Sequence, residues 1–207
     1  MKRLIDSTQK YDPSDYVVVL EDFMADDSAS RLTKTGSGTF ALLASQLNGV
    51  AQVDTGAGAD QDTSIGFGET NLALGKLPTL TTRVKLGTFN TGITRIGFVK
   101  DSDEYARFVI DASGNVKVDV DGGTAAKVDA IDTGEDLVAG TWYELEVVAR
   151  EDGSVIFLVD GEKVYTTDAD VATHASTSEY DLFMGIEDAG ANQHTLDIDY
   201  ILVSQKR

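Results

Sequence analysis

The chain has 207 residues, no Cys, and a net charge of −18 from 35 acidic and 17 basic residues. That length fits one large all-β domain or two small ones, and the 42% hydrophobic content is enough for a core that needs no disulfides. The negative charge disfavours nucleic acid as a partner. No apolar run approaches the roughly 20 residues of a membrane helix, so we expect neither nucleic acid nor a membrane as a partner.

The first segment, residues 1–15, is polar and contains Pro13. It is interpreted as an N-terminal arm that precedes a single domain over residues 16–207. Lys2 and Arg3 could open a signal peptide, but no apolar segment of 7–15 residues follows them. We therefore expect synthesis in the cytoplasm without a signal peptide.

From Tyr16 onward the hydrophobic period is two, which is typical of strands with one buried face. "TTRVKL" (81–86) alternates in this way. "RFVIDASGNVKVDV" (107–120) predicts a hairpin that turns at residues 112–115. "DVDGG" (119–123) is too short for an EF-hand loop and is interpreted as a turn.

The later strands follow the same period. In residues 143–149, Tyr143, Leu145, Val147 and Ala149 are predicted to face inward, with Glu144 and Glu146 outward. "SVIFLV" (154–159) is apolar on both faces and predicts a central strand covered on both sides; Asp160-Gly161 predicts a tight turn after it. "TLDIDYILV" (195–203) predicts one face with Leu196, Ile198, Tyr200 and Leu202, and the other with Asp197 and Asp199.

About eleven to thirteen strands are expected in all. No stretch predicts an amphipathic helix, and "NLALGKLP" (71–78) amounts to one turn at most. Two stacked sheets are the natural arrangement for so many alternating strands. The predicted fold class is all-β, a two-sheet antiparallel jelly-roll sandwich.

Three segments resemble the concanavalin A-like (laminin-G-like) jelly-roll superfamily, which includes family-16 glycan hydrolases and binding modules. They are "VVVLEDFMADD" (17–27), "GTWYELEVV" through "VDGEKVY" (140–165), and "LDIDYILVSQ" (196–205). The resemblance implies the lectin/glucanase type of jelly roll. These patterns are specific for the fold and weak for function.

The order of several segments also resembles tailed-phage virion proteins with this jelly roll. The segments are "EDF", a Gly-rich stretch over 38–64, "TTRVKL" and "IGFV". This resemblance implies a non-enzymatic capsid decoration or stabilising protein on the exterior of the head. Its partners would be the major capsid protein shell and copies of itself, most simply as a trimer. The alternative is a carbohydrate-binding, lectin-like module that recognises a cell-surface or environmental glycan.

Catalytic residues are not expected. The family-16 hydrolases need the pattern E-x-D-x-x-E on one strand, with two carboxylates acting as nucleophile and acid. The nearest match places Glu at the second position, Glu146, and Ala149 at the third. Glu144 and Glu146 are therefore interpreted as solvated outer-face residues.

No cofactor is predicted, but a structural calcium ion is weighed because hard cations bind Asp-rich loops. In the superfamily such an ion often lies where the first and last strands meet. By that resemblance Asp199 would be a ligand, with Glu21 or Asp22 opposite. His174 and His194 lack ligand spacing and are expected at the surface. Trp142 is expected to pack in the core or at its rim, and Tyr105, Tyr165 and Tyr180 are the residues that would line a sugar site.

Both ends of the chain are basic, with Lys2 and Arg3 at one end and Lys206 and Arg207 at the other. The superfamily usually places its first and last strands side by side. We therefore expect a small basic spot on an acidic body, either as solvated ends or as a docking point for an acidic partner surface such as a capsid shell.

Overall fold

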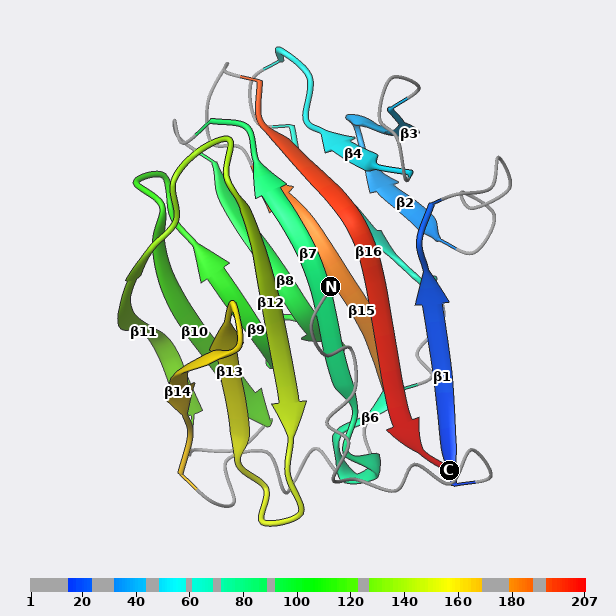
Figure 1. Ribbon diagram of the computed structural model, residues 1–207, viewed down its shortest axis with the longest axis vertical. Helices are drawn as coiled ribbons and strands as arrows, with labels where there is room; N and C mark the ends of the chain where they lie inside the picture. Colours follow the sequence, from blue (N-terminus) through cyan, green and yellow to red (C-terminus); the bar gives the residue numbers. More distant parts are fainter. Residues whose placement is uncertain are drawn as a thin grey trace.

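The computed structural model describes residues 15–23, 32–43, 49–58, 61–68, 72–88, 92–122, 127–168, 179–187 and 193–207. These ranges hold sixteen strands and one 3₁₀ turn, Leu74–Lys76. The strands form two eight-stranded antiparallel sheets stacked as a sandwich (Figure 1), which confirms the predicted fold class. There are more strands than expected because several edge strands are too short to carry a periodic pattern. Nowhere in the described ranges does a helix have the length and apolar character to cross a membrane.

The first sheet, sheet A, faces the viewer in Figure 1. Its order is β14-β13-β12-β7-β16-β4-β3, and β1 pairs with the C-terminal half of β16. The first and last strands are therefore neighbours. Sheet A contains β1 (Tyr16–Glu21), β3 (Thr39–Leu42), β4 (Ala51–Asp54), β7 (Thr79–Leu86), β12 (Trp142–Ala149), β13 (Val155–Val159), β14 (Glu162–Thr166) and β16 (Thr195–Lys206).

The second sheet, sheet B, lies behind sheet A in the same view. Its order is β11-β10-β9-β8-β15-β5-β2, and the short β6 pairs with the start of β15. Sheet B contains β2 (Thr33–Gly36), β5 (Thr63–Gly66), β6 (Leu72–Ala73), β8 (Ile93–Val99), β9 (Glu104–Ile110), β10 (Asn115–Gly122), β11 (Lys127–Asp136) and β15 (Glu179–Glu187).

The hydrophobic core lies between the two sheets and is built from the inward residues of the alternating strands. Phe108 of sheet B meets Phe157 of sheet A edge to face, with ring centroids 5.0 Å apart and both side chains fully buried. Such pairs contribute beyond the apolar area they bury. The hairpin turn after β13 has Asp160 at φ 50° and Gly161 at φ 80°. This is the left-handed backbone that a two-residue Asp-Gly turn requires, so that prediction is confirmed.

The predicted faces of the last strand are wrong beyond Ile198. The register of β16 against β7 shifts between Ile198 and Tyr200. Beyond that bulge Ile201 and Val203 are buried, while Tyr200 and Leu202 are only partly buried on the other face. One inserted residue reverses every later side chain, and strict alternation cannot show it.

Two further local predictions are wrong. β13 is buried only on the side of Val155, Phe157 and Val159, because it lies next to the edge strand β14 and its other face stays partly exposed. Asp119 and Asp121 belong to strand β10 and are buried, so "DVDGG" is not a turn up to Gly122. Gly123 lies outside the described residues.

Candidate functional site

The acids considered for catalysis lie on the outer face of sheet A, the face turned away from the core. Glu144 and Glu146 are partly buried there, whereas Ala149 faces the core. The Tyr200 hydroxyl donates a hydrogen bond to Glu144. Burial raises the pKa of Glu146, and the neighbouring Glu144 carboxylate raises it further. β12 therefore carries two outward acids, and the third position of the hydrolase pattern lies on the opposite face.

Trp142 lies on this outer face, partly buried, and not in the core. Arg83 and Lys85 approach its ring at 5.2 and 5.0 Å from the centroid. Each cation also forms an ion pair at 2.8 Å, Arg83 with Asp199 and Lys85 with Asp197. The two cations beside Trp142 are thus matched by the carboxylates of Asp199 and Asp197, so we do not choose this area as the candidate site.

The residues weighed for calcium are brought near one another but are engaged in other contacts. Glu21 lies opposite Ile201 in the pairing of β1 with β16, close to Asp199 along the strand. The Glu21 carboxylate accepts a hydrogen bond from the Phe23 N–H at 3.2 Å, and Asp199 pairs with Arg83. Asp22 follows β1 and is exposed. In the part of the chain that the structure describes, no three His, Cys, Asp or Glu residues gather to hold a metal ion. The calcium site stays a prediction.

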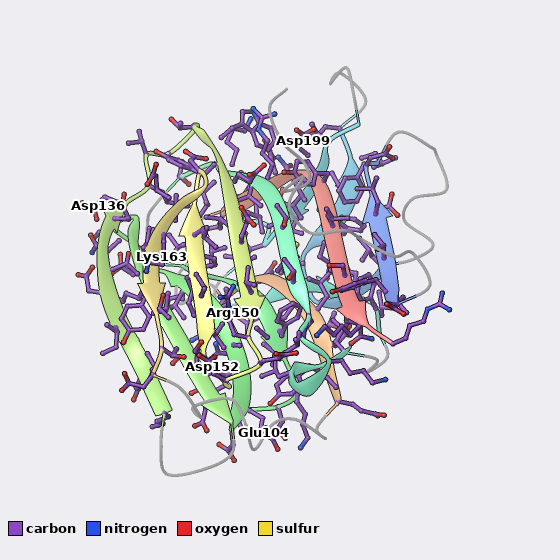
Figure 2. All side chains as sticks on the ribbon, turned by 60° about the horizontal axis from the view of Figure 1, so that its bottom comes forward. Glu104, Asp136, Arg150, Asp152, Lys163 and Asp199 are labelled. Atoms are coloured by element: carbon purple, nitrogen blue, oxygen red, sulfur yellow. The ribbon has the colours of Figure 1, made fainter. Side chains whose placement is uncertain are left out.

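The described part of the basic spot lies at the lower end of sheet A. Tyr16 pairs with Lys206, and the Arg207 N–H donates to the Asp15 carbonyl at 2.9 Å. Lys206 forms a 3.0 Å ion pair with Glu151 at the rim of an open hollow of about 470 Å³. Figure 2 shows Arg150 and Asp152, which also line this hollow, well away from Asp199. Lys2 and Arg3 lie outside the described residues.

The structure describes only one of the two histidines and shows the three tyrosines that were expected to line a sugar site. His194 is buried, not at the surface: its Nε2 accepts a hydrogen bond from the Gly92 N–H at 3.2 Å. His174 lies outside the described residues. Tyr105 and Tyr180 are buried, and Tyr165 packs against the core. These three tyrosines therefore do not form one exposed sugar-binding surface.

A different concave site lies on the outer face of sheet B. Along β15 the outward residues are Phe183, Gly185 and Glu187, because the residues between them are buried. Gly185 pairs with Arg95 of β8 on one side and with Ser64 of β5 on the other. A hollow of about 210 Å³ lies here. Its lining is Thr35, Gly36, Asp62, Thr63, Ser64, Phe183, Ile186 and Glu187.

The packing beside this hollow depends on a residue without a side chain. A Cβ at Gly185 would lie 2.6 Å from the Ser64 Cβ and 3.0 Å from two atoms of the Phe183 ring. Ser64 and the Phe183 ring therefore close over Gly185, which is buried, and only glycine fits there. The contact with the Gly185 backbone fixes the position of the Phe183 ring at the hollow.

Arg95 lies behind the site and holds one of its acids. Its guanidinium makes an ion pair with Glu187, which lines the hollow, and its side chain is 18% exposed. The Arg95 Nε is enclosed by its neighbours, so a ligand in the hollow does not reach it. The contribution of Arg95 is to fix the position of the Glu187 carboxylate.

The chemistry around the hollow favours a neutral, hydroxyl-rich ligand. Asp62 and Glu187 offer carboxylate acceptors, and Ser64 and Thr35 offer hydroxyls. Two carboxylates at the hollow disfavour an anion. Sequence reasoning missed this site because its residues come from β2, β15 and the region of β5, which no local motif connects. A lone Gly within the apolar strand "LFMGIE" was the one available signal.

This chain is similar to a known protein family and to several solved structures. A family model described as the concanavalin A-like lectin/glucanases superfamily matches residues 33–204. A protein of unknown function from Shewanella oneidensis MR-1 has a TM-score of 0.68 at 17% identity, covering 93% of this chain and 87% of that chain. The carbohydrate recognition domain of Emp47p has a TM-score of 0.62 at 10% identity, covering 94% and 99%.

The binding domain of Botulinum neurotoxin DC, solved with rat synaptotagmin II, has a TM-score of 0.63 at 10% identity. The match covers 91% of this chain and 48% of that chain, so the present chain spans about half its length. No curated protein sequence matches. At these identities the structural likeness shows the fold alone. The family model, however, covers most of the chain, and the chain therefore belongs to the concanavalin A-like lectin/glucanase superfamily.

Proposed function

We propose that this protein is a glycan-binding module and that the hollow beside Phe183 holds one neutral sugar unit. The observation that carries the proposal is a small hollow that brings the Phe183 ring together with the carboxylates of Glu187 and Asp62 and the hydroxyls of Ser64 and Thr35. Sugar hydroxyls would donate to Glu187 and Asp62. The C–H face of the ring would pack on Phe183.

The size and shape of the hollow agree with this ligand. A volume of about 210 Å³ suits a single ring more than an extended chain, so neighbouring sugar units would project into solvent. The superfamily and the likeness to the carbohydrate recognition domain of Emp47p support a carbohydrate ligand. We propose no hydrolysis, because the acid pattern of β12 is incomplete at Ala149.

A capsid-decorating role would be compatible with the same module. Its support is the resemblance of short sequence segments to tailed-phage proteins, together with the acidic composition. No described contact favours a capsid partner over a glycan, and we therefore propose glycan binding as the function.

Binding to an array of neutral and acidic glycans, followed by titration calorimetry of the best ligand, tests the proposal. Glu187→Gln removes a charged acceptor at the hollow and should weaken binding about tenfold, as expected for a hydrogen bond to a charged group. Phe183→Ala should also weaken it. Asp199→Asn is the matched control, since Asp199 also forms an ion pair with an Arg on an outer sheet face.

The control should bind like the wild type. Equal affinity of Glu187→Gln and the wild type would refute the site, and absence of binding to every glycan would refute the function. Preference for sulfated or carboxylated glycans would contradict the neutral ligand.

A further inference from the structure

A second surface, distinct from the sugar site, is formed by the edge strand β1. Among the described residues β1 pairs with β16 alone, and Figure 1 shows it at the border of sheet A with no labelled strand beyond it. An edge strand presents a row of backbone N–H and C=O groups to which another strand can pair.

Over residues 16–20 the side chains of β1 carry no charge on either face. The described residues include five large hydrophobics that are exposed, and three of them lie here: Val17 at 43%, Val18 at 54% and Leu20 at 51%. Residues 16–20 read YVVVL and contain no charge, in a chain with a net charge of −18. On the outer face Leu20 lies beside Leu202 of β16, which extends the apolar area inward.

The other edges of the sandwich are protected against strand pairing. β11 is charged at five of its ten positions and its pairing with β10 shifts register twice. β14 begins with the exposed pair Glu162 and Lys163 and also has a register shift. β2 and β3 are only four residues long. Charges, bulges and short length are the usual means of blocking edge-to-edge pairing, and β1 has none of them over residues 16–20.

We propose that β1 is the interface of a symmetric dimer in which the β1 strands of two copies pair antiparallel about a two-fold axis. An axis perpendicular to the sheet keeps the two outer faces on one side. It must then pair outward residues with outward residues. A register centred on Val18 does this. Val18 meets its own counterpart, Tyr16 meets Leu20 and Val17 meets Val19, so every exposed apolar side chain gains an apolar partner.

The occupant is a second copy because β1 is self-complementary in this register and brings no charge inside the paired segment. The charged residues that flank this segment make the stability of the dimer depend on salt. Asp15 would face Glu21 of the other copy at both ends, and like charges oppose pairing. Screening acts over about 10 Å at 0.1 M salt, so moderate salt should strengthen the dimer. The two-fold pair differs from the trimer expected from the sequence.

The absence of Cys makes the test direct. Val18→Cys places one thiol at the proposed axis, where opposed Cβ atoms lie close enough for a disulfide. Under mild oxidation this variant should form covalent dimers in high yield. Val17→Cys, whose partner is Val19, should form far fewer. Val138→Cys is the control, because Val138 is 62% exposed but lies between β11 and β12, outside any strand.

A second measurement needs no cross-link. Analytical ultracentrifugation of the full chain over a dilution series should show a monomer–dimer equilibrium that shifts toward dimer with salt. Val18→Lys should be monomeric, and Val138→Lys should match the wild type. A monomeric wild type in moderate salt, a trimer, or equal cross-linking at positions 17, 18 and 138 would overturn the proposal. Glycan binding by the monomer would not bear on it, so the two proposals can fail separately.

Discussion

Removing Asp119 should destabilise the protein strongly. Asp119 is 5% exposed in β10 and accepts hydrogen bonds from Arg107 Nε at 3.2 Å and Nη2 at 2.9 Å. It also accepts the Ala130 N–H at 3.3 Å, which holds that residue at φ 47°. Asp119→Ala would leave a mostly buried guanidinium without its counterion, and would remove the acceptor of the Ala130 N–H.

The expected loss follows from the burial of the pair. The side chains of Arg107 and Asp119 are 15% and 8% exposed. Breaking such a pair from one side costs about 3–5 kcal/mol, and the stacking of Arg107 on Tyr105 at 3.9 Å keeps the guanidinium from turning out to water. We expect a loss near 3 kcal/mol, since some water still reaches Arg107. That is a large part of the roughly 5–15 kcal/mol that stabilises a domain.

Urea unfolding followed by the fluorescence of the single Trp142 measures the loss. Asp199→Ala is the control: its partner Arg83 is 45% exposed, and that ion pair should contribute less than about 1 kcal/mol. Replacing both partners with apolar residues, Arg107→Met with Asp119→Leu, should regain most of the stability. A loss below about 1 kcal/mol for Asp119→Ala would refute the reasoning.

Three further predictions concern stability. The Asp111 pKa lies at about 2, against an ordinary 3.8, because hydrogen bonds from Lys117, Ser113 and Asn115 outweigh the opposing effect of burial. The stability this contributes should be present above about pH 4 and lost as the pH falls toward 2; Asp111→Ala should remove that part of the acid dependence in urea titrations at several pH values. Glu146 has a raised pKa, so its folded form holds the proton more tightly and stability falls as the pH rises through the shifted range. Glu146→Gln should therefore raise the melting temperature at pH 7 but not at pH 3, and equal effects at both would contradict the assignment. Phe157→Ala should cost about 3–5 kcal/mol in urea unfolding, whereas a cost near zero would show that the two sheets do not depend on the contact with Phe108.

Much of the fold could be predicted from local patterns. The alternation in residues 81–86 and 143–149 assigned the buried faces of β7 and β12, since a strand with one wet face must alternate. Asp160-Gly161 marked its turn because few other residue pairs accept two positive φ angles. Even the outward placement of Glu144 and Glu146 followed from this period.

The predictions that were wrong concern residues whose surroundings depend on contacts between distant segments. The bulge in β16 lies between Ile198 and Tyr200, within its long pairing with β7. No residue type near Asp199 predicts it. His194 is buried because the backbone of Gly92 reaches it from another part of the chain. The residues next to Asp199 and His194 in the sequence indicate neither the bulge nor the burial.

The same division applies to function. By itself the sequence determined a two-sheet sandwich, its superfamily, and the absence of a complete acid pattern on β12, because these depend on period, turn chemistry and spacing along one strand. Only the tertiary structure decided where a ligand or a partner would bind. The hollow exists because sheet pairing brings Thr35, Ser64 and Phe183 together from three strands. The edge at β1 exists because its one partner in the described structure is β16, a strand at the far end of the chain.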